Sequence, residues 1–145
     1  MSRLYNFPKP STISFVYTKN TVMNIPKGHQ TVMPYLILKN AHRFIEFTKH
    51  VFEAENTFEK LREDGTSVMH AEINIGGSTI MFGECSDEYP TQNANMFVYV
   101  DDADATYEKA ISFNAITLRA PEDQSYGRSC GVKDPFGNTW WITSV

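Results

Sequence analysis

Two small groups of polar residues in this sequence have side chains that could do chemistry. His70 and Glu72 lie two residues apart in a segment whose alternation predicts a strand, so both side chains would share one face. An imidazole beside a carboxylate can act as a base, anchor a polar ligand or supply two ligands to a metal ion. A solvent-facing or partly buried pair on the outer face of a sheet would have the same spacing, so both interpretations stay open.

Tyr126 and Arg128 form the second group and precede the last predicted strands. An arginine can hold a carboxylate or a phosphate through two parallel hydrogen bonds, and a tyrosine can stack on a ring or donate a hydrogen bond. The alternative is a structural loop in which Arg128 pairs with Asp134 or Glu122.

The chain ends in a predicted β-hairpin. Residues 134–138 combine Asp, Pro, Gly and Asn, which favour a tight turn, and an aromatic strand follows. Trp140 and Trp141 are adjacent in that strand, so their side chains should face opposite sides. One of them can therefore line a cavity, unless both pack in the core.

Composition limits the class of protein. The chain has 145 residues, 41% hydrophobic and 21% charged, as expected for one soluble globular domain. The net charge is −4 and the lysines are scattered, which argues against nucleic-acid binding and favours a cationic ligand over an anionic one. No apolar run approaches the roughly 20 residues of a membrane span, so we expect no membrane partner. The two cysteines, Cys85 and Cys130, predict free thiols in a reducing cytoplasm.

The start of the chain differs from the rest. Residues 1–28 are polar and contain several prolines, which predicts an N-terminal extension before a folded domain at 29–145. Either Met23 is the natural initiator and residues 1–22 are not native, or the extension is an arm that packs on a partner.

Hydrophobic periodicity predicts the elements of the first half. A helix at 41–52 has apolar side chains at spacings of three and four, and Asn40 is its candidate cap. Alternation in the third strand places Val68 on the same face as His70 and Glu72. Strands are predicted at 32–38, 57–62, 67–75 and 78–82, with a glycine turn at 76–77 and a linker at 84–93.

The second half repeats this order. Asp101 or Asp102 should cap a helix that runs to about Phe113. Strands are predicted at 95–100, 116–119, 130–133 and 139–143, with a loop at 121–125.

The two halves align on each other, so that residues 38–41 lie over residues 100–103. Each half has the order βαβββ, which gives modules at about 31–85 and 94–145. One module alone leaves a sheet face uncovered, whereas two modules, from one chain or from two, can form a curved eight-stranded sheet around a ligand. The sequence therefore predicts an α+β fold of two βαβββ modules forming a curved mixed sheet around a cavity.

Several segments together resemble the vicinal oxygen chelate superfamily, which includes glyoxalase I, extradiol dioxygenases, fosfomycin-modifying enzymes and bleomycin-resistance proteins. The PhnB-like branch is the most similar. The resemblance spans nearly everything after Met23 and is carried by residues 25–28, 31–36, 69–76, 121–124, 126–128 and 133–140. It implies the glyoxalase/bleomycin-resistance fold.

Metal-dependent members of this superfamily hold a divalent cation with four side chains, two from each module. The resemblance puts these places at Met33 and Asn95 in the first strands, and at Ile80 or Met81 and Trp141 in the last strands. None of these residues has the imidazole or carboxylate that divalent metals prefer. We therefore expect no metal cofactor there, and we expect Trp141 to form an aromatic cavity wall where metal-binding relatives carry a carboxylate.

The resemblance implies a metal-free, homodimeric cytoplasmic protein that binds a small aromatic or cationic molecule, as bleomycin-resistance proteins do. The alternatives are a metal-dependent glyoxalase-type lyase or dioxygenase with a rearranged site around His70 and Glu72, and a metal-free enzyme. The candidate ligand-binding residues are His70, Glu72, Asn95, Tyr126, Arg128 and Trp141.

Overall fold

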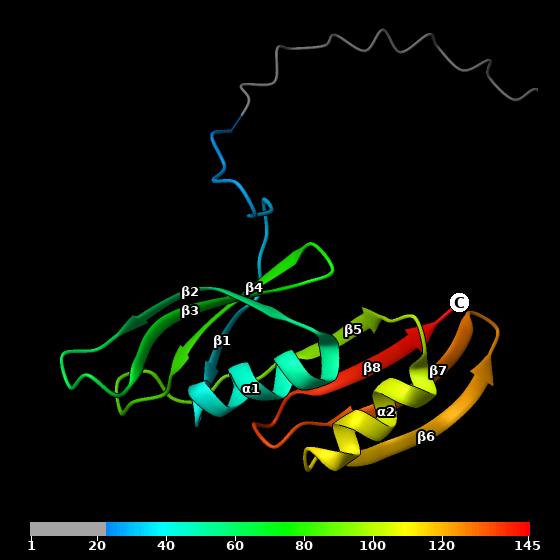
Figure 1. The fold of residues 1–145 in the computed structure, drawn as a ribbon. Helices are drawn as coiled ribbons and strands as arrows, with labels where there is room; N and C mark the ends of the chain where they lie inside the picture. The colour runs from blue at the N-terminus through cyan, green and yellow to red at the C-terminus, as the bar shows by residue number, and fades with distance from the viewer. Residues whose placement is uncertain (1–22) are drawn as a thin grey trace, which may run out of the picture.

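The computed structural model describes residues 23–145 as two βαβββ modules in succession (Figure 1). The two interpretations of residues 1–22 fall outside the described part of the chain. No helix within residues 23–145 has the length and apolarity needed to cross a membrane.

The first module contains β1 (Tyr35–Leu38), α1 (Ala41–Phe52), β2 (Glu55–Leu61), β3 (Val68–Ile75) and β4 (Ser78–Glu84). The second contains β5 (Asn95–Tyr99), α2 (Ala103–Ser112), β6 (Ile116–Gln124), β7 (Gly127–Lys133) and β8 (Thr139–Ser144).

Each module forms its own four-stranded mixed sheet. The strand orders are β1-β4-β3-β2 and β5-β8-β7-β6, so the same topology occurs twice. In each sheet the first strand runs parallel to the last strand of the module, and the other neighbours are antiparallel. The α+β class and the repeated module are confirmed, with the eight strands divided between two sheets in the described chain.

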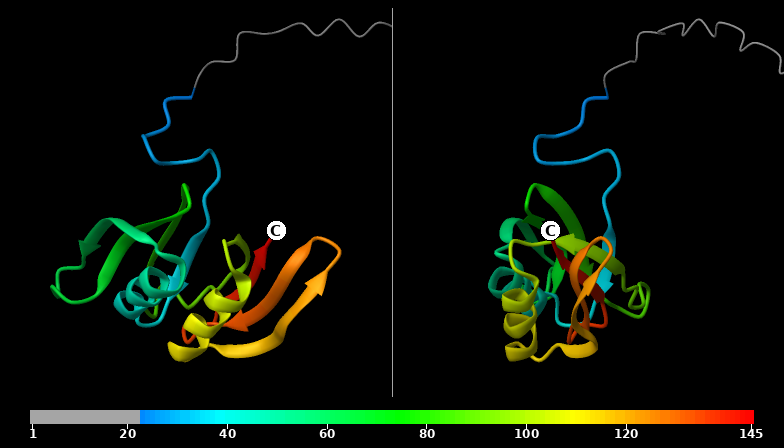
Figure 2. Two further views of the ribbon diagram at one scale, coloured as in Figure 1. Left: turned by 45° about the vertical axis from the view of Figure 1, so that its right-hand side comes forward. Right: turned by 90° about the vertical axis from the view of Figure 1, so that its right-hand side faces the viewer.

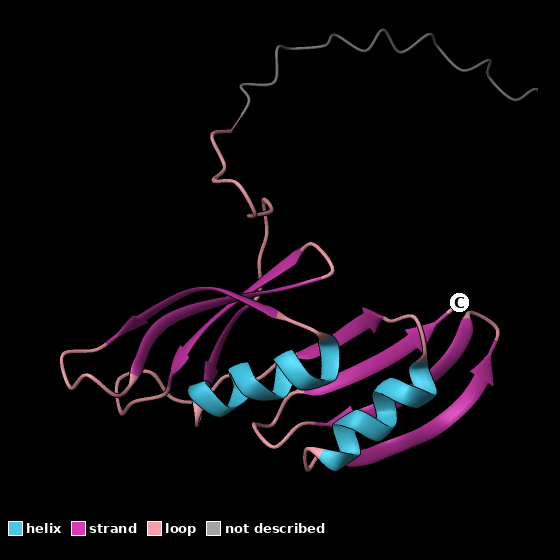
Figure 3. Cartoon of the chain, in the orientation of Figure 1, coloured by secondary structure: helices cyan, strands magenta, loops and turns pink. Residues whose placement is uncertain are grey.

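One hydrophobic core joins the modules. Figures 1 and 2 show α1 and α2 side by side, with one sheet extending to either side of them. Phe44 of α1 makes edge-to-face contacts with Phe82 of its own sheet, at 5.0 Å between ring centroids, and with Phe136 of the other module, at 5.6 Å. Phe52 lies 4.5 Å from the Trp140 ring. Because both helices lie between the sheets, one face of each sheet is covered and the other is open (Figure 3).

The N-terminus of α1 is capped differently from the sequence-based expectation. Asn40 has a left-handed backbone, with φ of 63°, and its side chain makes no cap hydrogen bond. The Glu84 carboxylate accepts hydrogen bonds from the backbone N–H of Asn40 at 2.8 Å and of Ala41 at 2.7 Å. A carboxylate at this position also interacts favourably with the helix dipole. In α2 the Asp102 side chain caps the helix by accepting from the Ala105 N–H.

A bulge changes the face on which β3 begins. The register between β2 and β3 shifts near Lys60, so that Val68 is fully buried. Met69, which alternation assigns to the core, is 40% exposed. The prediction that Val68 shares a face with His70 was therefore wrong, because one extra residue in a strand reverses the alternation.

The predicted loop at 121–125 was also wrong over most of its length. Strand β6 continues to Gln124, with register shifts on both sides of Arg119. β6 is an edge strand, where Pro121 is tolerated because its missing N–H is not needed for a second neighbour.

Asp134 organises the final hairpin, whose turn and strands are confirmed. The carboxylate is 3% exposed and accepts from the backbone N–H groups of Phe136 and Asn138, both at 2.9 Å. It also accepts from Asn138 Nδ2 at 3.0 Å and from Trp140 Nε1 at 2.8 Å. Burial raises the pKa of the Asp134 carboxyl, and the four hydrogen bonds act against that rise.

We predict that Asp134→Asn lowers the free energy of unfolding by about 2–3 kcal/mol, because an amide group would leave a buried donor without an acceptor. Urea denaturation measures this change. Asp87→Asn in the exposed linker is the control and should stay within about 0.5 kcal/mol of the wild type. Equal stability of both variants would contradict the structural role of Asp134.

Candidate functional site

The open face of the second sheet carries a row of side chains across its strands. Arg119 of β6 lies opposite Gly131 of β7, and Gly131 lies opposite Trp141 of β8. Trp141 in turn lies opposite Phe97 of β5. Strand alternation therefore brings a guanidinium, a gap without a side chain and two aromatic rings onto one surface.

The indole of Trp141 lies across this surface, from β5 to β7. Its Nε1 donates to Asn95 Oδ1 at 2.7 Å. At its other end, a Cβ added to Gly131 would lie only 2.7 Å from Trp141 Cε3, so glycine makes room for the ring. Trp141 is only half-buried, whereas its neighbour Trp140 is in the core. The two tryptophans do face opposite sides, and Trp141 offers part of a flat aromatic surface to solvent.

Arg119 lies beside this indole and was not identified from the sequence. Its Cζ is 5.2 Å from the centroid of the Trp141 ring, within the range of a cation–π contact. Its Nη2 donates to Ser129 Oγ at 3.0 Å and to the Tyr126 hydroxyl at 3.3 Å. The hydrogen bond from Arg119 lowers the pKa of Tyr126, because a nearby cation favours the phenolate. Alternation along the strand predicted at 116–119 could have placed Arg119 on a sheet face, but the bulges in β6 shift that alternation.

Further exposed rings lie on the same face of this sheet. Phe97 lies 5.1 Å from Tyr99 and 6.3 Å from Tyr126, between ring centroids. About half or more of each of these three side chains is exposed. We call Phe97, Tyr99, Tyr126 and Trp141 the aromatic cluster.

The open face of the first sheet carries a chain of hydrogen bonds. The Glu72 carboxylate contacts His70 Nε2 at 3.0 Å and His29 Nε2 at 2.7 Å. Tyr35 completes the chain, with its hydroxyl 3.0 Å from His70 Nδ1. If His70 donates from Nε2 to the carboxylate, its Nδ1 accepts the Tyr35 proton. Burial raises the pKa of Glu72, but the hydrogen bonds from His70 and His29 outweigh burial and lower it.

The four places that the resemblance assigns to a metal do not fit a divalent ion. Tyr35 pairs with Met81 as Phe97 pairs with Trp141, so Met81 is the equivalent of Trp141, while Ile80 is buried. The donor set is then two thioethers, an indole and the Asn95 amide, whose oxygen already accepts from Trp141. Within residues 23–145, no three His, Cys, Asp or Glu side chains are arranged to hold a metal.

The structure separates the six candidate residues into three places. Asn95, Tyr126 and Trp141 meet on the open face of the second sheet, and His70 and Glu72 meet on that of the first. Arg128 lies on the helix side, where its Nε and Nη2 contact both Asp104 oxygens of α2 at 2.8 and 3.0 Å. It also contacts Asp123, at 3.3 Å, instead of Asp134 or Glu122. Their roles in ligand binding stay predictions.

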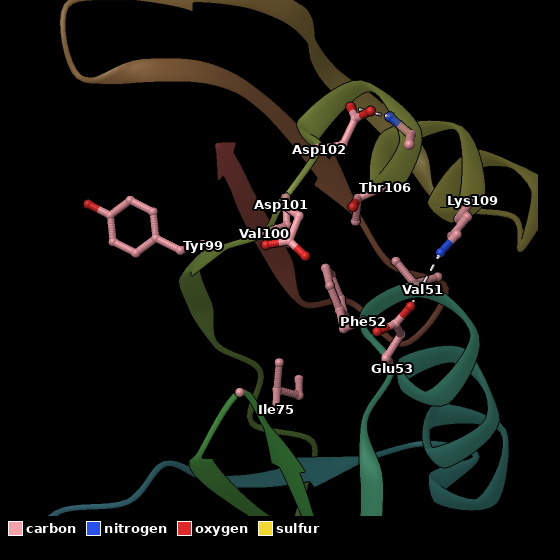
Figure 4. Close-up of a pocket in the computed structure, with 12 residues that line it drawn as sticks. Val51, Phe52, Glu53, Ile75, Tyr99, Val100, Asp101, Asp102, Thr106 and Lys109 are labelled. Atoms are coloured by element: carbon pink, nitrogen blue, oxygen red, sulfur yellow. Dashed lines mark hydrogen bonds and ion pairs between the residues drawn. The ribbon is translucent and has the colours of Figure 1, made fainter. Parts of the chain in front are cut away.

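Two hollows differ in chemistry. One of ≈ 950 Å³ runs along the open face of the first sheet and is lined by Tyr35, Met69 and Tyr89 among others. A smaller one of ≈ 340 Å³ lies where α1 ends and α2 begins (Figure 4). The smaller hollow is polar and contains the ion pair between Glu53 and Lys109, at 4.0 Å. The larger volume is of the size that holds a small organic molecule.

The two cysteines are free thiols, as predicted. Burial raises the pKa of the Cys130 thiol to about 11, which makes it a poor nucleophile.

Two βαβββ modules with the same topology define the fold class of this protein. Residues 28–142 match the model of the Glyoxalase/Bleomycin resistance protein/Dioxygenase superfamily, and the chain belongs to that superfamily.

Individual relatives agree with this assignment. An uncharacterized protein of Mycobacterium bovis is 29% identical, over 74% of this chain and 78% of its own length. A PhnB protein from Bacillus cereus has the same fold, with a TM-score of 0.67, 15% identity and coverage of 80% of this chain and 100% of its own. TnmS3, described as an antibiotic binding protein from Streptomyces sp. CB03234, gives a TM-score of 0.60 at 13% identity, over 80% of this chain and 98% of its own.

We predict that Gly131→Ala displaces the indole of Trp141, because the new Cβ would occupy the space of the ring. The chain has two tryptophans, so an ¹⁵N–¹H NMR spectrum contains two indole signals. The Trp141 signal should shift or broaden, and Asn95→Ala should move the same signal. The Trp140 signal, held by Asp134, is the internal control. An unchanged Trp141 signal in Gly131→Ala would show that the ring does not lie over β7.

Proposed function

We propose that this protein is a metal-free binding protein for a small molecule with a flat aromatic part. The main support is the Trp141 indole. A hydrogen bond to Asn95 and the space left by Gly131 keep it across an open sheet face. Rings stack favourably on such a surface, by about 0.5–1.5 kcal/mol beyond the burial of area. The aromatic cluster supplies further surface of the same kind.

The fold-level likeness to TnmS3, described as an antibiotic binding protein, supports this proposal by analogy alone. The donor set at the four superfamily metal places supports it independently, because thioethers, an amide and an indole suit organic contacts better than a divalent cation. The proposal therefore assigns binding, without a reaction, to the aromatic cluster.

We also propose that the protein works in the cytoplasm as a homodimer in which the open faces border a second copy and leave room for the ligand between the two chains. Exposed apolar side chains lie on both faces, including Phe58 on the first sheet and Tyr99, 68% exposed, on the second. β5 has one strand neighbour and so presents a free edge within the described chain. Sedimentation equilibrium should give the mass of two chains.

The second candidate function is a metal-dependent lyase or dioxygenase with a site around Glu72. It is favoured by one observation, the convergence of two imidazoles, His29 and His70, on this carboxylate. Two histidines and one carboxylate are a ligand set of iron oxygenases. In the described residues these three side chains are hydrogen-bonded to one another and are not arranged around an ion, so this function requires them to rearrange.

Metal analysis separates the two functions. We predict that protein purified without chelator contains far less than one zinc, nickel or iron ion per chain, because the superfamily places lack suitable donors. Stoichiometric metal that disappears in His70→Ala, but remains in the control His42→Ala, would overturn the metal-free proposal in favour of the second function. His42 contacts Glu59 and not Glu72, so its loss leaves the candidate site intact.

A thermal-shift screen of small aromatic compounds tests binding itself. A compound that binds the folded state stabilises it by about 2.7 kcal/mol at 100 times its Kd, which raises Tm measurably. We predict that Trp141→Ala removes this shift for ligands of the aromatic cluster. Phe113→Ala, a partly exposed aromatic side chain at the end of α2, is the control and should keep the shift. Undiminished binding by Trp141→Ala would show that Trp141 does not form the ligand surface.

A further inference from the structure

We infer that the ligand of the aromatic cluster carries a carboxylate, and that Arg119 binds it. This inference rests on the proposed small-molecule function and adds the charge of the ligand. A negatively charged ligand is the opposite of the cationic ligand that the net charge of the chain favours. The two differ because the local environment of one side chain differs from the average of the chain.

The guanidinium of Arg119 is held in one orientation by its neighbours. Nη2 donates to Ser129 and Tyr126, and the buried Thr143 hydroxyl donates to Ser129 Oγ at 2.9 Å. An arginine fixed in this way loses little further conformational freedom when a ligand binds. The sheet therefore presents a preorganised cation on its open face, beside the indole of Trp141.

This guanidinium also has an unmet hydrogen-bonding capacity. Arg119 Nε is buried and has no hydrogen-bond partner among the described residues. The nearest acid is Glu122, whose Oε1 lies 3.6 Å away, too far for a hydrogen bond. Leaving a buried donor without an acceptor is unfavourable, and a carboxylate is the group whose two oxygens match the planar fork of an arginine.

Glu122 is a weak internal competitor for this position. Its side chain is 54% exposed and already accepts from Gln124 Nε2 at 2.7 Å. A ligand carboxylate that came within hydrogen-bond distance of Arg119 would therefore replace a long, solvent-screened contact. Lys133 adds a second positive charge to this face of β7, because it alternates with Ser129 and Gly131.

A cationic ligand is disfavoured in the same place. A positive group stacked on Trp141 would lie close to the Arg119 guanidinium, and like charges at short range repel. An aromatic ring on the indole with its carboxylate directed at Arg119 uses the stacking surface and the charge of the guanidinium. Because protein atoms cover Nε, that N–H gains an acceptor only when the side chains around it move slightly.

Three naphthalene compounds test the charge: 2-naphthoate, 2-naphthamide and 2-naphthylmethylamine, measured by calorimetry on the full chain. We expect naphthoate to bind about tenfold tighter than naphthamide or more, because hydrogen bonds to charged groups are the stronger ones, and the amine to bind weakest. Arg119→Gln should remove the preference for the acid while keeping the affinity for the amide. Glu122→Gln should strengthen naphthoate binding, and the exposed Arg43→Gln is the control that should change nothing.

The outcomes distinguish this inference from the proposed function. Equal affinity of acid and amide for the wild type, or no gain in Glu122→Gln, overturns the inference and leaves small-molecule binding standing. Absence of binding by all three compounds overturns both. If Arg119→Gln alters the association state of the protein and not its affinity for naphthoate, Arg119 binds a second copy and the inference is wrong.

Discussion

The buried carboxylate of Asp134 is the interaction on which the arrangement of the second module depends. Its hydrogen bonds to the turn and to Trp140 place that indole on the helix side of β8. Strand geometry then puts Trp141 on the open side. The same turn fixes β5, because Asn138 Oδ1 accepts from the Ala94 N–H at 3.0 Å. Asn95 therefore begins its strand beside the Trp141 indole, which it holds by a hydrogen bond.

The shared core decides which surfaces are available for function. Phe44 and Phe52 of α1 pack against residues of the second module, so the helices lie together between the sheets. The two open faces that result differ in chemistry. The first has a carboxylate between two imidazoles, with Tyr35 at the end of the chain of hydrogen bonds. The second has aromatic rings beside a guanidinium, which suits a flat molecule.

Two arginines on neighbouring strands have different partners, and this difference separates a structural role from a functional one. Arg128 contacts both carboxylate oxygens of Asp104 and thereby ties β7 to α2. Arg119, on the opposite face of the sheet, has neutral hydroxyl acceptors and a distant carboxylate. A guanidinium with a short, two-point carboxylate partner has little hydrogen-bonding capacity left for a ligand. A guanidinium with an N–H that lacks an acceptor keeps such capacity.

The sequence by itself determined the α+β class, the repeated βαβββ order, the final hairpin and the opposite directions of Trp140 and Trp141. These features depend on local periodicity and turn chemistry, which a single sequence contains. Only the tertiary structure decided that Glu84 caps α1, that β6 extends past Pro121, and that Arg119 lies beside Trp141. Bulges shift the alternation by one residue, and contacts between distant strands depend on register, so no local pattern could have specified them.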